Sequence, residues 1–320
     1  MTVTRIGLQI PTFAFQDVAD RDLFEKVAEI AGVAERSGFD SLWVMDHFYQ
    51  IPIMAPESDP MFEAYTLLAA IAARTEKISL GTLVTGVTYR NPALLAKQVT
   101  TLDLISKGRA ILGIGAAWHD TEHLGYGFAF PSVKERMDRL EETVQICQMM
   151  FTENRPSFAG NYYTIDQARN MPRPVRASGI PILIGGGGER RTLSLVAKYA
   201  DACNLFGDKE TIRRKIEVLE RHCATVGRDP GEITKTRLGG IVIAKTTAEA
   251  EKKAQKLAKV RNMDETRLRA YAAIGDPDTV AAQIRDYLDA GLDGMIFNMP
   301  DADDLEIVAL AGETLSKVIV

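Results

Sequence analysis

The chain has 320 residues, long enough for one large domain or two of average size, and its 46% hydrophobic content excludes an intrinsically disordered protein. A net charge of −5 argues against a nucleic-acid-binding surface, so the expected partner is a small molecule. The three cysteines lack a metal-binding or disulfide spacing and are expected to be reduced and mostly buried. No signal peptide or membrane-spanning run is apparent, so we expect a cytoplasmic protein without membrane contact.

Short apolar runs rich in β-branched residues follow one another along the chain and are the expected strands. The eight runs span residues 5–10, 41–45, 78–85, 109–115, 180–186, 201–206, 237–244 and 294–299. Their hydrophobicity is continuous, as in parallel strands covered on both faces, and helical patterns fill nearly every gap between them. This order predicts a (β/α)8 TIM barrel with insertions. An open doubly wound sheet is the alternative, because periodicity alone does not show closure.

The helices between these runs have recognisable ends, and two segments depart from the rhythm. Gly38 ends the first helix, Pro92 begins the third and Gly108 follows it. Residues 152–179 read as an insertion with a small hairpin, and residues 245–275 as a charged, solvated helix followed by an irregular stretch. No linker divides the chain, so we expect a single domain over residues 1–320.

Asp46 and His47 follow the second expected strand directly. In a TIM barrel the active site lies at the carboxyl ends of the strands, which places this pair at the expected rim. A histidine there can act as general acid or base near neutral pH, or hold a substrate hydroxyl while hydride is removed. The structural alternative is a loop-capping histidine with Asp46 as its hydrogen-bond partner.

Four glycines, Gly185 to Gly188, stand between the fifth expected strand and the next helix. Their backbone amides and the helix N-terminus suit an anion, so we expect a phosphate there, with Arg190 or Arg191 adding positive charge. A tight turn would need only one glycine. The spacing is neither a Rossmann fingerprint nor a nucleoside triphosphate loop.

Two further stretches bear on the chemistry. "GTLVTGVTYRNP" (81–92) is dense in small residues and would suit a backbone that bends around a flat ring, with a bulge or strained peptide.

"HDTEH" (119–123) matches the H-x-x-E-H zinc-peptidase pattern. That pattern needs a sustained helix, whereas this context favours a flexible surface loop, so we expect no metal.

These pieces together resemble the bacterial luciferase-like superfamily of flavin and deazaflavin oxidoreductases, and within it the actinobacterial enzymes that use coenzyme F420. The resemblance rests on "IGLQIP" (6–11), "GFDSLWVMDHF" (38–48), residues 78–118, "FPSVKERMDRLEE" (130–142), residues 180–207 and residues 275–300. It implies a barrel with a deazaflavin or FMN across its mouth and the cofactor phosphate in the glycine loop. It also implies a cis peptide between Leu83 and Val84, and a homodimer.

The resemblance also implies the roles of individual residues. His47 would assist hydride transfer. The expected cofactor contacts are Asp46, Thr82, Leu83, Val84, Thr85, Gly115, Ala116, Gly185, Gly186, Gly187, Gly188 and Arg190.

The resemblance is not complete. Sugar-phosphate dehydrogenases of this family place a carboxylic acid after the fourth strand, where this chain has Trp118, so we expect another small organic substrate. The expected function is an F420-dependent oxidoreductase. An FMN-dependent monooxygenase and a catalytically silent cofactor-binding protein are the alternatives.

Overall fold

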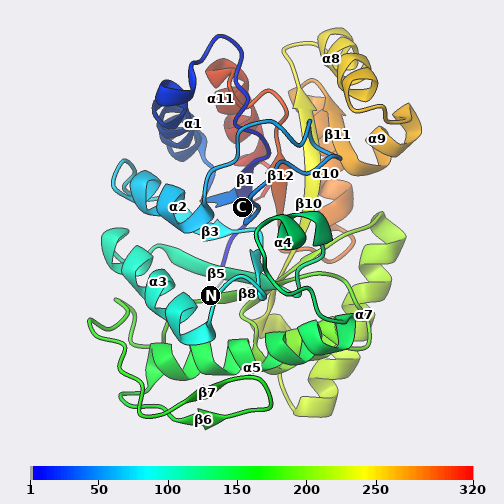
Figure 1. The fold of residues 1–320 in the computed structure, drawn as a ribbon. Coiled ribbons are helices and arrows are strands. Elements are labelled where there is room, and N and C mark those ends of the chain that lie inside the picture. The colour runs from blue at the N-terminus through cyan, green and yellow to red at the C-terminus, as the bar shows by residue number, and fades with distance from the viewer. Residues whose placement is uncertain (1–2, 320) are drawn as a thin grey trace.

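The computed structural model describes residues 3–319 and consists of a parallel β-barrel surrounded by helices (Figure 1). The barrel strands are β1 (Ile6–Ile10), β2 (Ser41–Val44), β3 (Ser79–Thr82), β5 (Ala110–Gly115), β8 (Ile182–Gly185), β9 (Ala202–Leu205), β10 (Thr234–Ile243) and β12 (Gly294–Asn298). Each lies within or over one of the eight apolar runs expected from the sequence.

The long strand β10 closes the barrel. Its residues Thr234–Arg237 pair with β9, and Thr236–Gly240 pair with β12, which in turn pairs with β1. The ring is therefore continuous, and the predicted TIM barrel is confirmed. The open doubly wound sheet is wrong, because such a sheet would leave two strands unpaired at its edges.

Eleven α-helices are present within residues 3–319, and they pack around the barrel. They are α1 (Leu23–Ser37), α2 (Ala64–Ala72), α3 (Pro92–Ile105), α4 (Asp120–Gly125), α5 (Val133–Thr152), α6 (Thr192–Tyr199), α7 (Lys209–Val226), α8 (Thr247–Val260), α9 (Glu265–Tyr271), α10 (Pro277–Leu288) and α11 (Leu305–Leu315). Gly38 ends α1 in the left-handed conformation at φ 112°, as its position predicted. The Asn91 side chain caps α3 by accepting from the amides of Ala93 and Leu94.

The third expected strand is split in two. It forms β3 and the two-residue β4 (Thr85–Gly86), and the peptide bond between Leu83 and Val84 is cis, as the resemblance implies. Each part pairs with β5, so the interruption lies against a neighbouring strand.

Two regions lie outside the regular alternation. Between α5 and β8, strands β6 (Phe158–Ala159) and β7 (Thr164–Ile165) form the expected hairpin, which lies beside α5 in Figure 1. Beyond β10, the sequence analysis missed helix α9 and strand β11 (Ala272–Gly275), which pairs with the far end of β10. Helix α8 buries a stripe of alanines against these strands, so only its outer faces are solvated.

The core has two layers. Side chains between the barrel and its helices form the larger cluster, and Trp43 fills the barrel interior beside Ile111, Leu183 and Ile296. All three cysteines are buried and free, as expected. Within the described residues, no helix combines the length and apolarity needed to cross a membrane.

Candidate active site

A cavity of about 560 Å³ opens at the carboxyl ends of the barrel strands, where active sites of this architecture lie. The predicted site residues on its wall are Asp46, His47, Leu83, Val84, Gly115, Ala116, Gly185 and Gly186. The remaining predicted residues, Thr82, Thr85, Gly187, Gly188 and Arg190, are not among those that line it. The sequence therefore located the cavity, although not every predicted residue faces it.

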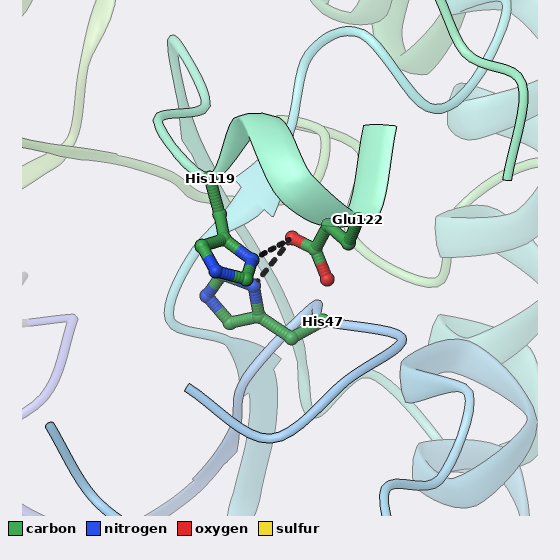
Figure 2. Close-up of side chains that lie close together, drawn as sticks. All are labelled: His47, His119 and Glu122. Carbon is green, nitrogen blue, oxygen red and sulfur yellow. Dashed lines mark hydrogen bonds and ion pairs between the residues drawn. The ribbon is translucent and has the colours of Figure 1, made fainter. Parts of the chain in front are cut away.

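His47 is held by Glu122, a residue that lies on α4. The Nδ1 atom of His47 is 2.6 Å from Oε1 of Glu122, and Figure 2 shows this one carboxylate oxygen facing both the His47 and His119 rings. The backbone amide of Phe48 donates to Oε2 of Glu122 at 2.8 Å, and the Tyr89 hydroxyl donates to Oε1. The carboxylate is thus surrounded by donors.

The ionisation of Glu122 determines which nitrogen of His47 carries a proton. Burial alone would raise the pKa of Glu122, but hydrogen bonds from His47, Tyr89 and Phe48 outweigh it and lower that pKa to about 2. An ionised carboxylate only accepts hydrogen bonds, so Nδ1 of His47 is the protonated nitrogen. Nε2 of His47 has no hydrogen-bond partner among residues 3–319 and remains available for a ligand.

Asp46 has a different set of partners. Its carboxylate receives two hydrogen bonds from Arg90, at 2.7 and 2.9 Å, and one from the amide of Gly86 at 3.0 Å. Arg90 also donates to Glu63. Burial would lower the pKa of Arg90, but the Asp46 carboxylate raises it, so Arg90 keeps its positive charge. Asp46 therefore ties the loop after β2 to the segment after β4, and it does not orient His47.

The wall around the split strand is supported from behind. Gln9 donates from Nε2 to the carbonyl of Leu83 at 3.0 Å. The hydroxyls of Thr82 and Thr85 lie 2.6 Å apart and are fully buried, and Tyr65 bonds to Thr85 at 2.6 Å. The two threonines thus hold the wall and do not face the cavity.

The glycine loop extends from the cavity edge towards α6. The amides of Gly187 and Gly188 donate to no acceptor within residues 3–319, whereas Lys215 donates to the carbonyl of Gly187 at 2.5 Å. Burial lowers the pKa of Lys215. Arg190 is exposed. The sequence analysis did not select Lys215, because it lies on α7, beyond the next strand, and a lysine in the middle of a helix carries no local signal.

Arg191, the alternative source of positive charge at the glycine loop, is committed elsewhere. Its guanidinium forms an ion pair with Asp138 at 2.7 Å. This leaves Arg190 as the candidate cation of the two.

The "HDTEH" segment is short helix α4, not the flexible surface loop expected from the sequence. His119, Glu122 and His123 are all buried. The two histidines of the motif do not converge on one point, because the ring nitrogens of His123 contact the Thr88 hydroxyl and the His119 carbonyl, each at 2.6 Å. The zinc-peptidase pattern is therefore not formed.

A different group has donor atoms close together, namely His47, His119 and Glu122, whose ligand atoms lie within 4.8 Å of one another. The 2.6 Å separation of His47 and Glu122 is a hydrogen-bond distance. Two ligands of a tetrahedral zinc ion would stand about 3.4 Å apart, given metal–ligand bonds of about 2.1 Å. The contact is that of a hydrogen-bonded pair.

The sequence analysis noticed Glu122 only as part of a zinc motif. Its partner His47 lies 75 residues earlier, and Tyr89 comes from a third segment. One signal in the sequence could have indicated the role of Glu122. Helix α4 begins soon after barrel strand β5 ends, and Glu122 is a carboxylate on this helix.

The family model described as luciferase-like monooxygenase matches residues 4–294. The chain belongs to the luciferase-like monooxygenase family. This confirms the resemblance that the sequence motifs carry.

Among curated members of the luciferase-like family, this chain is similar to two proteins named F420-dependent glucose-6-phosphate dehydrogenase. The one from Amycolatopsis mediterranei (strain U-32) is 31% identical over 307 residues, covering 87% of this chain and 89% of the relative. The one from Kineococcus radiotolerans is 29% identical over 310 residues, covering 87% and 88%.

Solved structures of the luciferase-like fold are also similar. The coenzyme F420-dependent tetrahydromethanopterin reductase from Methanopyrus kandleri has a TM-score of 0.79 at 21% identity, with 99% of each chain covered. A type II Baeyer-Villiger monooxygenase of Pseudomonas putida in complex with FMN has a TM-score of 0.78 at 20% identity, covering 99% of this chain and 98% of that one. At this identity the likeness shows the fold alone.

Proposed function

We propose that the chain is an oxidoreductase that uses coenzyme F420 to exchange a hydride with a small organic substrate. The names of its curated relatives support this cofactor. When bound, the deazaflavin supplies the hydride chemistry, and the chain supplies position and proton transfer. From the family resemblance we also propose a cytoplasmic homodimer.

The observation that carries the proposal is the contact between Nδ1 of His47 and the buried carboxylate of Glu122. This contact fixes the tautomer of His47, with the proton on Nδ1. The His47 ring lines the cavity, so its Nε2 atom is the nitrogen available to the substrate. Neutral Nε2 accepts the hydroxyl proton when an alcohol is oxidised, and protonated Nε2 donates when a carbonyl is reduced. The negative charge of Glu122 stabilises the imidazolium in both directions.

The glycine loop and the wall beside it suit the cofactor. The unpaired amides of Gly187 and Gly188 are available to phosphate oxygens, and exposed Arg190 adds positive charge nearby. Val84 lies against Gly115 and Gly185, where a Cβ would stand 2.8 and 2.7 Å from its methyl groups. These two positions therefore add no side chain to the wall.

We propose that the cofactor-contacting residues are Asp46, Leu83, Val84, Gly115, Ala116 and Gly185 to Gly188, with Arg190. Thr82 and Thr85 act from behind by holding the split strand in place. In this proposal the cluster of His47, His119 and Glu122 works through hydrogen bonds and requires no metal.

The test is a fluorescence titration of the purified protein with oxidised F420 and, in parallel, with FMN. We expect micromolar F420 binding at least about tenfold tighter than FMN binding. The variant His47→Ala should bind F420 within about threefold of the wild type and lose about 10²–10⁴-fold in turnover, because it lacks only the proton-transfer group. Full turnover by this variant would remove the role of His47.

The alternatives give different results in the same experiment. Selective FMN binding with oxygen consumption would indicate a monooxygenase, since deazaflavins do not readily activate oxygen. Tight F420 binding without turnover on a broad substrate panel would indicate a silent cofactor-binding protein.

A further inference from the structure

The cavity wall is mostly apolar where it is not glycine or backbone. Large side chains line it from the loop after β2, from the end of β5, from the end of β9 and from β10. They are Ile51, Ile53, Met54, Trp118, Phe206 and Leu238. Among the described residues, no lysine or arginine lines this cavity.

Three of these side chains leave apolar surface open to water at the cavity mouth. Ile53 is 46% exposed, Phe206 48% and Trp118 59%. Large apolar side chains that gather at the mouth of a cavity mark a surface that an apolar ligand covers. The Trp118 ring also lies 5.7 Å from the His47 ring, centroid to centroid, so this surface adjoins the proposed proton-transfer group.

Three arginines that border the cavity are engaged by the protein. Arg90 donates to the Asp46 carboxylate. Arg136 donates to the carbonyl of Ala116, and Arg237 donates to the carbonyl of Gly207. Rotating any of them towards a ligand would break the hydrogen bond that it makes to the protein.

A phosphorylated substrate would therefore meet an unfavourable wall. The carboxylate on the wall is Asp46, whose charge Arg90 already balances, and burying a phosphate dianion on this wall without a further cation is costly. The glycine loop is the anion site that the proposed function assigns to the cofactor. Within residues 3–319 no lysine or arginine lines this wall, and the unpaired backbone amides of Ala116, Ala117 and Trp118 on it carry no net charge.

We propose that the substrate of this site is an uncharged, largely apolar alcohol or carbonyl compound and not a sugar phosphate. The inference rests on the proposed function, and it separates this chain from the relatives named after glucose 6-phosphate. In the oxidation direction the C–H electron pair leaves the carbinol carbon as hydride for the deazaflavin. The hydroxyl proton passes to Nε2 of His47, and a C=O bond forms; reduction is the reverse.

The test compares two ligands on the protein loaded with F420. Cyclohexanone and glucose 6-phosphate are each titrated into the loaded protein by calorimetry, and we expect cyclohexanone to bind at least about tenfold more tightly. Tighter binding of glucose 6-phosphate, or no saturable binding of cyclohexanone, would overturn the inference. F420 is titrated first on the same sample, so failure to bind F420 counts against the proposed function and not against the substrate class.

A pair of variants tests the location. Phe206→Glu places a carboxylate on the apolar wall and should weaken cyclohexanone binding at least about tenfold. Val260→Glu places the same charge at an apolar position that is 74% exposed on α8 and does not line this cavity, so cyclohexanone affinity should stay within about threefold of the wild type. Equal effects of the two variants would place the ligand elsewhere and overturn the inference.

Discussion

At the scale of single residues, the neighbours Asp46 and His47 serve different purposes. Asp46 binds Arg90 and the amide of Gly86, whereas His47 binds Glu122. No hydrogen bond joins the two neighbours within the described residues. Asp46 is thus not the partner of His47 that the structural alternative assumed.

Glu122→Gln should remove a stabilising charge, and the effect should depend on pH. The folded-state pKa of Glu122 is about 2, against a usual 4.5, so its contribution is fully present above pH 4.5 and is lost as pH falls towards 2. This difference in pKa corresponds to about 3 kcal/mol of unfolding free energy. Urea unfolding of wild type and variant at about pH 7 and pH 3 should show the gap between them narrowing at the lower pH.

The control for Glu122 is Glu217→Gln, which removes an exposed carboxylate from α7. Its unfolding free energy should stay within about 0.5 kcal/mol of the wild type at both pH values. A gap between wild type and Glu122→Gln that is constant with pH would show that lost packing, and not lost charge, is responsible.

At the scale of elements, the split of the third strand depends on close approach to β5. A Cβ at Gly113 would collide with the carbonyl oxygen of Thr82, the last residue of β3. The small residues noted in residues 81–92 coincide with the interruption between β3 and β4. The requirement for glycine at position 113 concerns β5, a different strand. It cannot be recognised until the pairing of β3 with β5 is known.

Gly113→Ala should destabilise the protein by about 2 kcal/mol or more, because backbone must move to admit the methyl group. Gly32→Ala in α1 is the matched control. There the new Cβ meets only the Arg36 side chain at 3.2 Å, and alanine favours the helix, so we expect no loss or a gain of up to about 1 kcal/mol. Thermal and urea unfolding measure both variants, and equal losses would contradict the close-approach argument.

At the scale of the whole molecule, the barrel closes through β10, which pairs with β9, β12 and β11 along successive parts of its length. Trp43 fills the interior formed by this closure, and its side chain is fully buried. The interior therefore depends on strands from both halves of the chain.

We predict that residues 1–320 unfold as one domain. The chain has two tryptophans, and Trp118→Phe leaves Trp43 as the single tryptophan reporter inside the barrel. Urea unfolding followed by Trp43 fluorescence and by far-ultraviolet circular dichroism should give coincident transitions. Well-separated midpoints would indicate that part of the chain folds independently of the barrel.

The sequence by itself determined the eight barrel strands, most of the helices and the edge of the barrel where the cavity lies. Continuous apolar runs and helix caps such as Asn91 and Gly38 are local signals, and residues that follow parallel strands share one end of a barrel. These signals were enough to find His47 and the glycine loop.

Only the tertiary structure decided how the barrel closes and which groups His47 and Asp46 contact. Closure depends on pairing between β9 and β10, and the partners of His47 and Asp46 come from segments 75 and 44 residues away. Such contacts carry no periodic signal in the sequence, because each forms only after packing has oriented α4 and the segment after β4. The apolar wall was hidden for the same reason, since Trp118, Phe206 and Leu238 meet only around the closed barrel mouth.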